Sequence, residues 1–129
     1  MSIHFSYLLK YNSGVLKLIV FDDTIIVSEE NTGKIPKNLI SSANVITCGL
    51  SQKSAVTASS INDYGFVYCI QRGFFTGKCF GANLLLPQEF NITWNRKTDN
   101  INYCLETVTL MLLCGADPSD ISKNVLFID

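Results

Sequence analysis

Two aspartates and one arginine occupy places in the chain where α/β proteins often hold ligands. Asp22 and Asp23 directly follow the apolar run VLKLIVF, residues 15–21, and so stand at the carboxyl end of an expected strand. This pair has the chemistry to hold a metal ion or a ribose, but a plain turn after the strand is the interpretation we favour. Arg72 ends another apolar run beside glycine, where a guanidinium can bind a carboxylate or a phosphate. A partly covered surface arginine is the simpler alternative.

The cysteines form no recognisable metal or disulfide pattern. There are five, at Cys48, Cys69, Cys79, Cys104 and Cys114. Their odd number, their long spacings and the lack of a C-x-x-C pair argue against a disulfide framework and a zinc site. His4 is the only histidine, which disfavours a metal cluster and a catalytic Cys–His pair. We therefore expect the cysteines to be small apolar residues of the core, and we expect no metal and no cofactor. The free thiols also favour a reducing compartment, such as the cytoplasm.

The composition predicts one apolar soluble domain with little charge. The chain has 129 residues, of which 47% are hydrophobic and 16% charged. No window approaches the roughly 18 uninterrupted apolar residues of a membrane span, and the start lacks a secretion signal. Ten basic residues nearly balance eleven acidic ones, without a basic run. We therefore expect neither a membrane nor a nucleic acid as partner.

Residues 1–50 are expected to form a short parallel βαβ part. The expected elements are, in order, an amphipathic helix at 3–9, an apolar strand at 15–21, a polar loop at 28–34, a short helix at 36–43 and an apolar strand at 44–50. Pro36 suits the first turn of the short helix. A strand, a helix and a strand in this order favour parallel pairing.

Residues 51–99 have an antiparallel character. Two strand-like runs, 55–61 and 65–72, are separated by the turn NDY, and Gly65 completes a hairpin signal. A glycine-rich connection, GFFTGKCFGAN, leads to NLLLP and EFNITW, which supply further antiparallel strands. Trp94 ends the last of these and suits a core or an interface better than a ligand platform.

Residues 100–129 are predicted to hold a pair of helices. Asp99 or Asn100 caps a helix of about four turns, Gly115 ends it in a left-handed conformation, and Pro118 prevents its continuation. Asp117 then caps a second short helix. The whole chain is therefore predicted to be one α/β domain with a parallel part, a hairpin part and a helical part.

The long helix is more apolar than one sheet face requires. Ile101, Leu105, Val108 and Leu112 form one stripe, and the apolar arc extends beyond half the circumference. We expect residues 101–114 to bury one face on the sheet and the other against a second subunit or a partner protein. The candidate interface residues are Leu110, Leu113 and Trp94.

The order of motifs resembles the second half of the central domain of the Mur ligase family, the ATP-dependent amino-acid ligases of peptidoglycan precursor synthesis. The matching runs are KLIVFDDTIIV, IPKNLISSANVITCGLSQKSAVTASSI and the closing GADPSDI. The family has an apolar strand ending in an aspartate pair, strands like VITYGL and ADVTATNI, and a helix followed by G-[IA]-D-P-x-x-I. The resemblance covers roughly residues 15–126 and implies a Mur-ligase central-domain fold.

The chain departs from this family at its nucleotide site. The phosphate-binding loop G-x-x-x-x-G-K-[ST] is missing, because GFFTGKC has three residues between its glycines and ends in Cys79 instead of a hydroxyl residue. The family's adenine-contacting asparagine in N-x-x-N is replaced by Tyr103, three residues after Asn100. No counterpart of the family's C-terminal domain follows Ile128.

Three functions remain open. The first is a non-catalytic Mur-ligase-like domain, a possible pseudoenzyme, that acts by self-assembly or by binding a partner. The second is a protein that binds a nucleotide or a UDP-linked precursor near Asp22, Asp23, Asn100 and Tyr103. The third is half of a split ligase whose phosphate loop lies on another chain. We expect the first, and with it no enzymatic activity.

Overall fold

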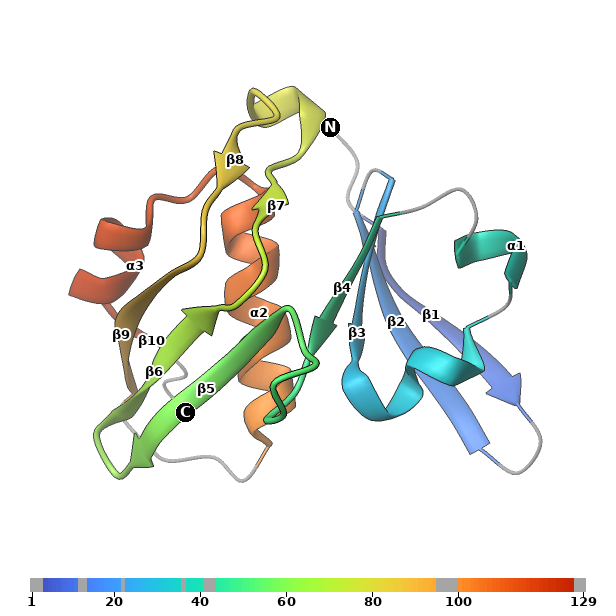
Figure 1. Ribbon diagram of the computed structural model, residues 1–129, viewed down its shortest axis with the longest axis horizontal. Helices are drawn as coiled ribbons and strands as arrows, with labels where there is room; N and C mark the ends of the chain where they lie inside the picture. The colour runs from blue at the N-terminus through green and yellow to red at the C-terminus, as the bar shows by residue number, and fades with distance from the viewer. Residues whose placement is uncertain are drawn as a thin grey trace.

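The computed structural model describes residues 4–11, 14–21, 23–35, 37–40, 44–94 and 100–126, and every structural statement below concerns these residues. They form a mixed α/β fold around a curled eight-stranded sheet (Figure 1). The sheet has the order β1 (His4–Tyr11), β2 (Gly14–Phe21), β3 (Thr24–Ser28), β4 (Asn44–Cys48), β5 (Val56–Asn62), β6 (Gly65–Ile70), β9 (Gln88–Trp94) and β10 (Val125–Leu126). The other elements are η1 (Glu29–Lys34), α1 (Lys37–Ile40), the two-stranded ribbon of β7 (Phe74–Phe75) and β8 (Leu84–Leu85), η2 (Lys78–Phe80), α2 (Ile101–Leu113) and α3 (Pro118–Lys123).

The chain begins with a strand and not with the predicted helix at 3–9. β1 pairs antiparallel with β2, from His4 opposite Val20 to Tyr11 opposite Gly14. Pairing with a neighbouring apolar strand outweighs the helical spacing of a few apolar side chains.

The parallel pair is present, but its first strand is β3 and not β2. Phe21 lies opposite Thr24, so the chain reverses through Asp23 and β3 runs antiparallel to β2. β3 then pairs in parallel with β4 from Thr24 opposite Asn44 to Ser28 opposite Cys48. The connection contains η1, where a polar loop was expected, and α1, while Pro36 lies outside the described residues.

β3 is the strand that the fold buries on both faces. All five of its residues are buried. One face joins the main core, while Ile25 and Val27 form a second apolar cluster with Ile35, which follows η1. A strand with cover on both sides is expected to be continuously apolar, and TIIV fits this rule.

The hairpin predicted after residue 50 is confirmed. β5 and β6 pair antiparallel, and β9 pairs antiparallel with the other edge of β6. Gly65 is required at the start of β6, because a Cβ atom there would lie 1.9 Å from the carbonyl oxygen of Ile92. The sheet curls, so β5, β6 and β9 stand at an angle to β1–β4 (Figure 1).

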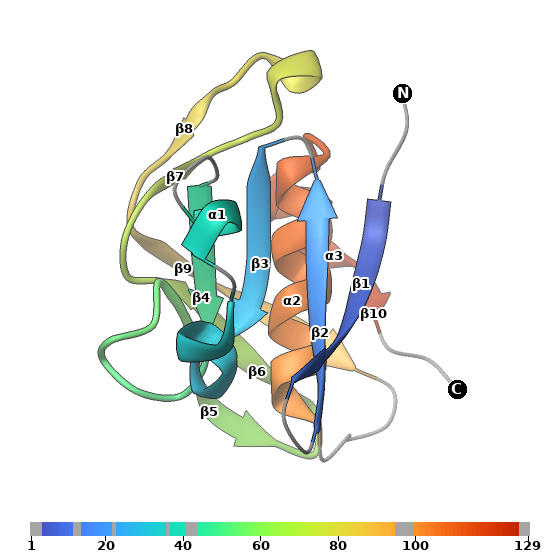
Figure 2. The ribbon, with the colours of Figure 1, turned by 90° about the vertical axis from the view of Figure 1, so that its right-hand side faces the viewer.

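α2 fills the hollow of this curled sheet. Figure 2 shows β2 and β3 running alongside the helix, which also contacts β4 and β5. The helix begins as predicted: Asn100 caps it, with its side-chain oxygen accepting the backbone N–H of Tyr103 at 3.0 Å. Gly115 has the left-handed conformation expected after the helix, with φ of 90°. Asp117 caps α3, whose Ile121 is buried.

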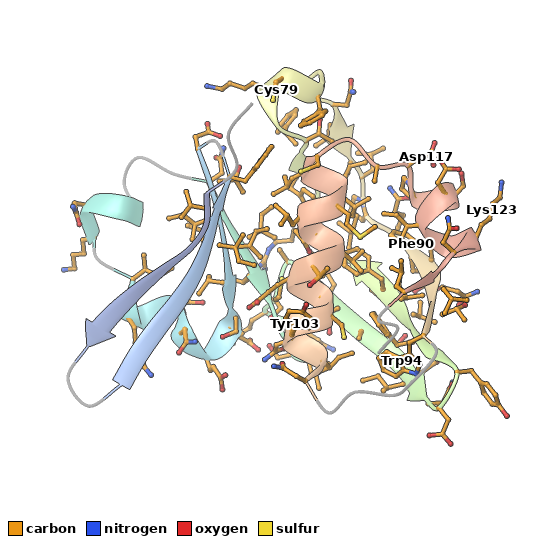
Figure 3. The ribbon with its side chains drawn as sticks, turned by 180° about the vertical axis from the view of Figure 1, so that it is seen from behind. Cys79, Phe90, Trp94, Tyr103, Asp117 and Lys123 are labelled. Carbon is orange, nitrogen blue, oxygen red and sulfur yellow. The ribbon has the colours of Figure 1, made fainter. Side chains whose placement is uncertain are left out.

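Residues 73–85 form an arm that rises beyond the sheet, at the top of Figure 1. The ribbon of β7 and β8 makes its stem, and η2 lies at its tip, where Figure 3 labels Cys79. The arm is fixed near its tip, because the backbone N–H of Gly77, next to η2, donates to the carbonyl of Leu113 at 2.9 Å. In addition, Phe80 stacks on Phe21, with ring centroids 6.2 Å apart.

No helix among the described residues is long and apolar enough to cross a membrane.

Candidate functional site

The residues predicted to bind a ligand lie in three separate places. Asp22 lies outside the described residues. Asp23 is exposed in the turn before β3, and its carboxylate lies 3.9 Å from the amino group of Lys78 at the arm tip. Because both side chains are well exposed, this ion pair contributes little to stability. The ion pair does, however, hold the tip of the arm next to the start of β3.

Arg72 supports a loop. Its guanidinium donates to the carbonyl oxygen of Lys53 and, at 3.5 Å, to the hydroxyl of Thr47. The neighbouring Gln71 donates to the carbonyls of Ser51 and Ser54, at 3.1 and 2.9 Å. Together the two side chains tie residues 51–54 to the end of β6. Arg72 thus stabilises the conformation of this surface loop.

Asn100 and Tyr103 do lie together, in a polar pocket of about 170 Å³ at the first turn of α2. Figure 3 shows Tyr103 at this end of the helix, where its side chain is 51% exposed. The other lining residues are Ser28, Glu30, Asn31, Asn102 and Glu106. The lining contains two carboxylates and no cationic side chain, so it favours ligands that donate hydrogen bonds over phosphates.

The side-chain oxygen of Asn102 is the distinctive group of this polar pocket. The atom is buried and has no hydrogen-bond partner among the residues that the structure describes, which is uncommon for a buried amide oxygen. Nearby, the side chain of Asn31 donates to the hydroxyl of Ser28 at 3.0 Å. A ligand hydroxyl or amine that reached Asn102 would supply the missing donor.

The expected single pocket for Asp23, Asn100 and Tyr103 is not formed. Asp23 precedes β3, whereas the polar pocket contains Ser28 at the opposite end of the strand. At about 3.3 Å per residue, a five-residue strand separates the two places by roughly 13 Å. The run TIIVS forms the separate strand β3, which was not predicted, and Asp23 therefore lies at the end of this strand opposite to the polar pocket.

Two of the three expected interface side chains belong to the core of this chain. Leu113 is fully buried, and Trp94 is buried against Phe66, with ring centroids 5.2 Å apart. Neither side chain offers surface to a second subunit. Leu110 is half-buried and packs at the margin of the core. The wide apolar arc of α2 is explained largely by the curl of the sheet, which gives the helix neighbours on several sides within one chain.

The arm carries an apolar surface that the sequence analysis did not single out. Phe75 lies directly opposite Leu84 in the ribbon, and the two are 58% and 50% exposed. Leu86, two residues further along, is 61% exposed. We call Phe75, Leu84 and Leu86 the arm patch. The alternation of Leu84 and Leu86 between Gly81 and Pro87 was the available signal, but the sequence interpretation placed Phe75 in a glycine-rich connection and the leucines in a further antiparallel strand.

A cleft of about 280 Å³ separates the stem of the arm from the sheet. It is lined by Thr24, Asn44, Val45, Ile46, Gly73, Phe74 and Phe75. We call this the β4–β7 cleft, because its walls come from these two strands. Phe75 belongs both to the cleft and to the arm patch, so the two features are continuous.

The buried thiols are not suited to nucleophilic chemistry. Burial raises the pKa of Cys48 to about 12 and that of Cys104 to about 11. Both therefore remain protonated at neutral pH, while a cysteine nucleophile must act as the thiolate. Among the residues that the structure describes, no group of three or more His, Cys, Asp or Glu side chains is arranged to hold a metal ion.

Comparisons of the chain with protein-family models, with curated proteins and with solved structures found no match. The resemblance to Mur ligases therefore rests on the sequence motifs alone.

Proposed function

We propose that this chain is a non-catalytic, Mur-ligase-like domain that acts by binding another polypeptide through the arm patch. The observation that carries the proposal is the pair of Phe75 and Leu84, which face each other across the ribbon and are both at least half exposed. Burying a side chain of this size contributes about 1.5–3 kcal/mol. Contiguous exposed apolar side chains on a protruding element therefore indicate an interaction surface.

The attachment of the arm adds support. The bond from Gly77 to Leu113 and the stacking of Phe80 on Phe21 fix the arm on α2 and β2. A surface that is held in place before binding loses less conformational freedom when a partner docks. The protonated state of Cys48 and Cys104 is consistent with a binding role, and we propose a reducing, cytoplasmic setting for these free thiols.

Site-specific photo-crosslinking tests this proposal. A photoreactive phenylalanine analogue at position 75 is expected to form a discrete adduct in the native cell, and the adduct is expected to disappear in a Leu84→Ser, Leu86→Ser background. The matched control is the same analogue at Tyr64, an exposed aromatic in the turn between β5 and β6. Equal labelling from positions 75 and 64, or an adduct that survives the double substitution, would remove the proposal.

Light scattering on the purified chain decides whether the partner is a second copy. A particle of 14.3 kDa is the single chain, and twice that mass is a dimer. A dimer that dissociates on Phe75→Ser would identify self-assembly through the arm patch as the form that binding takes.

The second candidate function is binding of a small ligand in the polar pocket of α2, and the unpartnered oxygen of Asn102 favours it. The lining chemistry fits the hydroxyl groups of a nucleoside or a sugar better than phosphates. A thermal-shift series with adenosine, ATP and a UDP-linked muramoyl peptide tests this, since a ligand of the native state raises the melting temperature. No shift at millimolar ligand, or a shift unchanged by Asn102→Ala, would exclude this pocket.

A further inference from the structure

The edge of β4 that faces away from β3 is open over most of its length. In the parallel ladder, the backbone N–H of Asn44 donates to the carbonyl of Asp23 at 2.7 Å, so Asn44 and Ile46 direct their backbone groups towards β3. Because these groups alternate along a strand, the N–H and C=O of Val45 point the other way. On that side β5 reaches only Cys48, which lies opposite Val56. No described strand pairs with the outer edge of Val45.

The facing edge of β7 is open as well. The backbone N–H of Thr76 donates to the carbonyl of Asn83 at 2.9 Å, which makes Thr76 and Asn83 a hydrogen-bonded pair of the ribbon. The next pair, Phe75 and Leu84, is therefore a non-hydrogen-bonded pair. Consequently the N–H and C=O of Phe75 point away from β8. In Figure 1 the side of β7 opposite β8 faces β4.

The β4–β7 cleft therefore lies between two strand edges, each with main-chain groups directed into it. Both Val45 and Phe75 line the cleft. Its other lining includes the apolar side chains of Ile46 and Phe74 and no charged side chain. Open edges are usually protected by charge, proline or a covering element, and the lining of this cleft includes neither a charged residue nor proline.

The arm, which forms one wall of the cleft, is held in place. Gly77 is tied to Leu113, and the ion pair between Asp23 and Lys78 spans the top of the cleft from the start of β3 to the tip of the arm. Below, the pairing of Cys48 with Val56 closes the gap between β4 and β5. These contacts hold the arm and β4 in place on either side of the cleft.

We propose that an extended segment of a partner polypeptide enters the β4–β7 cleft as an additional β-strand. Its main chain bonds to the exposed groups of Val45 on one side and of Phe75 on the other, as in other cases of strand addition to a sheet edge. Alternate side chains of the segment face inwards, next to Ile46 and Phe74, so the segment has apolar residues at every second position and no proline in its centre. This inference rests on the proposed binding function and names the class of partner.

The lining of the cleft favours a strand over a small molecule. At about 280 Å³ the cleft lies at the lower limit of typical small-molecule pockets, and its lining offers no charged side chain to orient such a ligand. The backbone N–H and C=O groups of Val45 and Phe75, one pair on each side, are complementary to another backbone. Continuity of the cleft with the arm patch also allows a polypeptide to cover Phe75, Leu84 and Leu86 as it leaves the cleft.

The probe for the test is a set of peptides selected from a random phage-displayed library against the immobilised full chain, and then synthesised. We expect selected sequences with alternating apolar residues. In amide hydrogen exchange, the N–H groups of Val45 and Phe75 are expected to become protected when the peptide binds to the unmodified protein. Val45→Pro removes the N–H that faces the cleft without removing a bond to β3, and is expected to weaken peptide binding about tenfold or more.

Val45→Ala is the matched control, because it shortens the same side chain but keeps the N–H. It is expected to bind the peptide within about threefold of the unmodified protein, and circular dichroism verifies that both variants fold. If Val45→Pro fails to fold, the exchange of Val45 and Phe75 in the unmodified protein decides the question alone.

Three other results would overturn the addition of a strand from a partner polypeptide, and they are distinguishable. Peptides that need the arm patch, yet bind both Val45 variants equally and protect neither amide, would leave the binding function standing without the added strand. A dimer whose own association protects Val45 would make a second copy the occupant. Failure to select any peptide, together with no crosslink from position 75, would remove both the strand and the proposed function.

Discussion

The hydroxyl of Tyr68 lies 2.7 Å from the hydroxyl of Thr109, and both side chains are fully buried where α2 crosses the sheet. Thr109 donates its own proton to the carbonyl of Leu105 at 2.7 Å, so its oxygen accepts the proton of Tyr68. The thiol of Cys48, 3.9 Å away, approaches the same oxygen. One threonine therefore satisfies polar groups from two strands of the sheet.

Replacing Thr109 by valine is expected to lower the free energy of unfolding by about 1–3 kcal/mol, because the buried hydroxyl of Tyr68 loses its acceptor. Urea unfolding, followed by the fluorescence of Trp94, measures the change. Tyr68→Phe removes the same bond without leaving a donor unpaired and is expected to cost less, about 0.5–1.5 kcal/mol. If the two costs simply add in the double variant, the hydroxyls are not coupled.

The buried thiols predict a loss of stability at alkaline pH. Burial raises the pKa of Cys48 from 9.0 to about 12, so the folded state keeps a proton that the unfolded state releases above pH 9. The contribution of this thiol is therefore complete below pH 9 and declines between pH 9 and 12. Cys48→Ala is expected to flatten this decline in urea midpoints. An unchanged slope would mean that another group titrates there.

Accessibility separates the five thiols. At pH 8, a thiol reagent is expected to modify the exposed Cys79 first, whereas the buried Cys48 and Cys104 react only on unfolding. Mass spectrometry of partially labelled protein identifies the order. Early labelling of Cys104 would show that α2 separates from the sheet under native conditions.

Gly77→Ala is expected to loosen the arm. A Cβ atom at this position would lie 2.4 Å from the ring of Phe21 and 3.1 Å from the carbonyl of Leu113. The expected loss of stability is about 1–3 kcal/mol, as for other overpacked sites. Gly33→Ala is the control, because a Cβ atom there meets nothing within 4 Å. Equal melting temperatures for the two variants would contradict a tightly seated arm.

Two leucines of α2 distinguish its core face from its outer face. Leu105 is fully buried, so Leu105→Asp is expected to unfold the protein, because it introduces an unpaired buried charge. Leu110 is half-buried, and Leu110→Asp is expected to give a folded protein. Light scattering of Leu110→Asp also tests the predicted assembly through α2: a dimer of the unmodified chain that survives this substitution would have its interface elsewhere.

The parts of the fold that the sequence predicted well are those with local signals. Asn100 and Asp117 cap their helices, Gly115 ends α2, and the turn NDY lies in the hairpin of β5 and β6. In each case a few neighbouring residues determine the backbone, so spacing and residue type are sufficient information.

The sequence-based predictions were wrong where pairing with a distant strand determines the local structure. The first run was assigned to a helix although it pairs with β2, and β3 was joined to the end of β2 although the chain reverses at Asp23. The same limitation affects the candidate sites. Leu113 belongs to the core because the sheet curls around α2, and Phe75 is exposed because the arm leaves the sheet. Neither the curl nor the arm is encoded in a local pattern.

The helix that fills the sheet is synthesised after most of the strands that surround it. Along the chain, every strand up to β9 precedes α2, and neighbours in the sheet follow one another in sequence order. At roughly 5–20 residues per second, the stretch from Trp94 to Leu113 takes the ribosome about one to four seconds. During this interval the nascent chain exposes the apolar face around Phe66 and Tyr68, which α2 covers in the finished protein. We therefore expect truncated chains that end before α2 to bind chaperones more strongly than chains that include this helix.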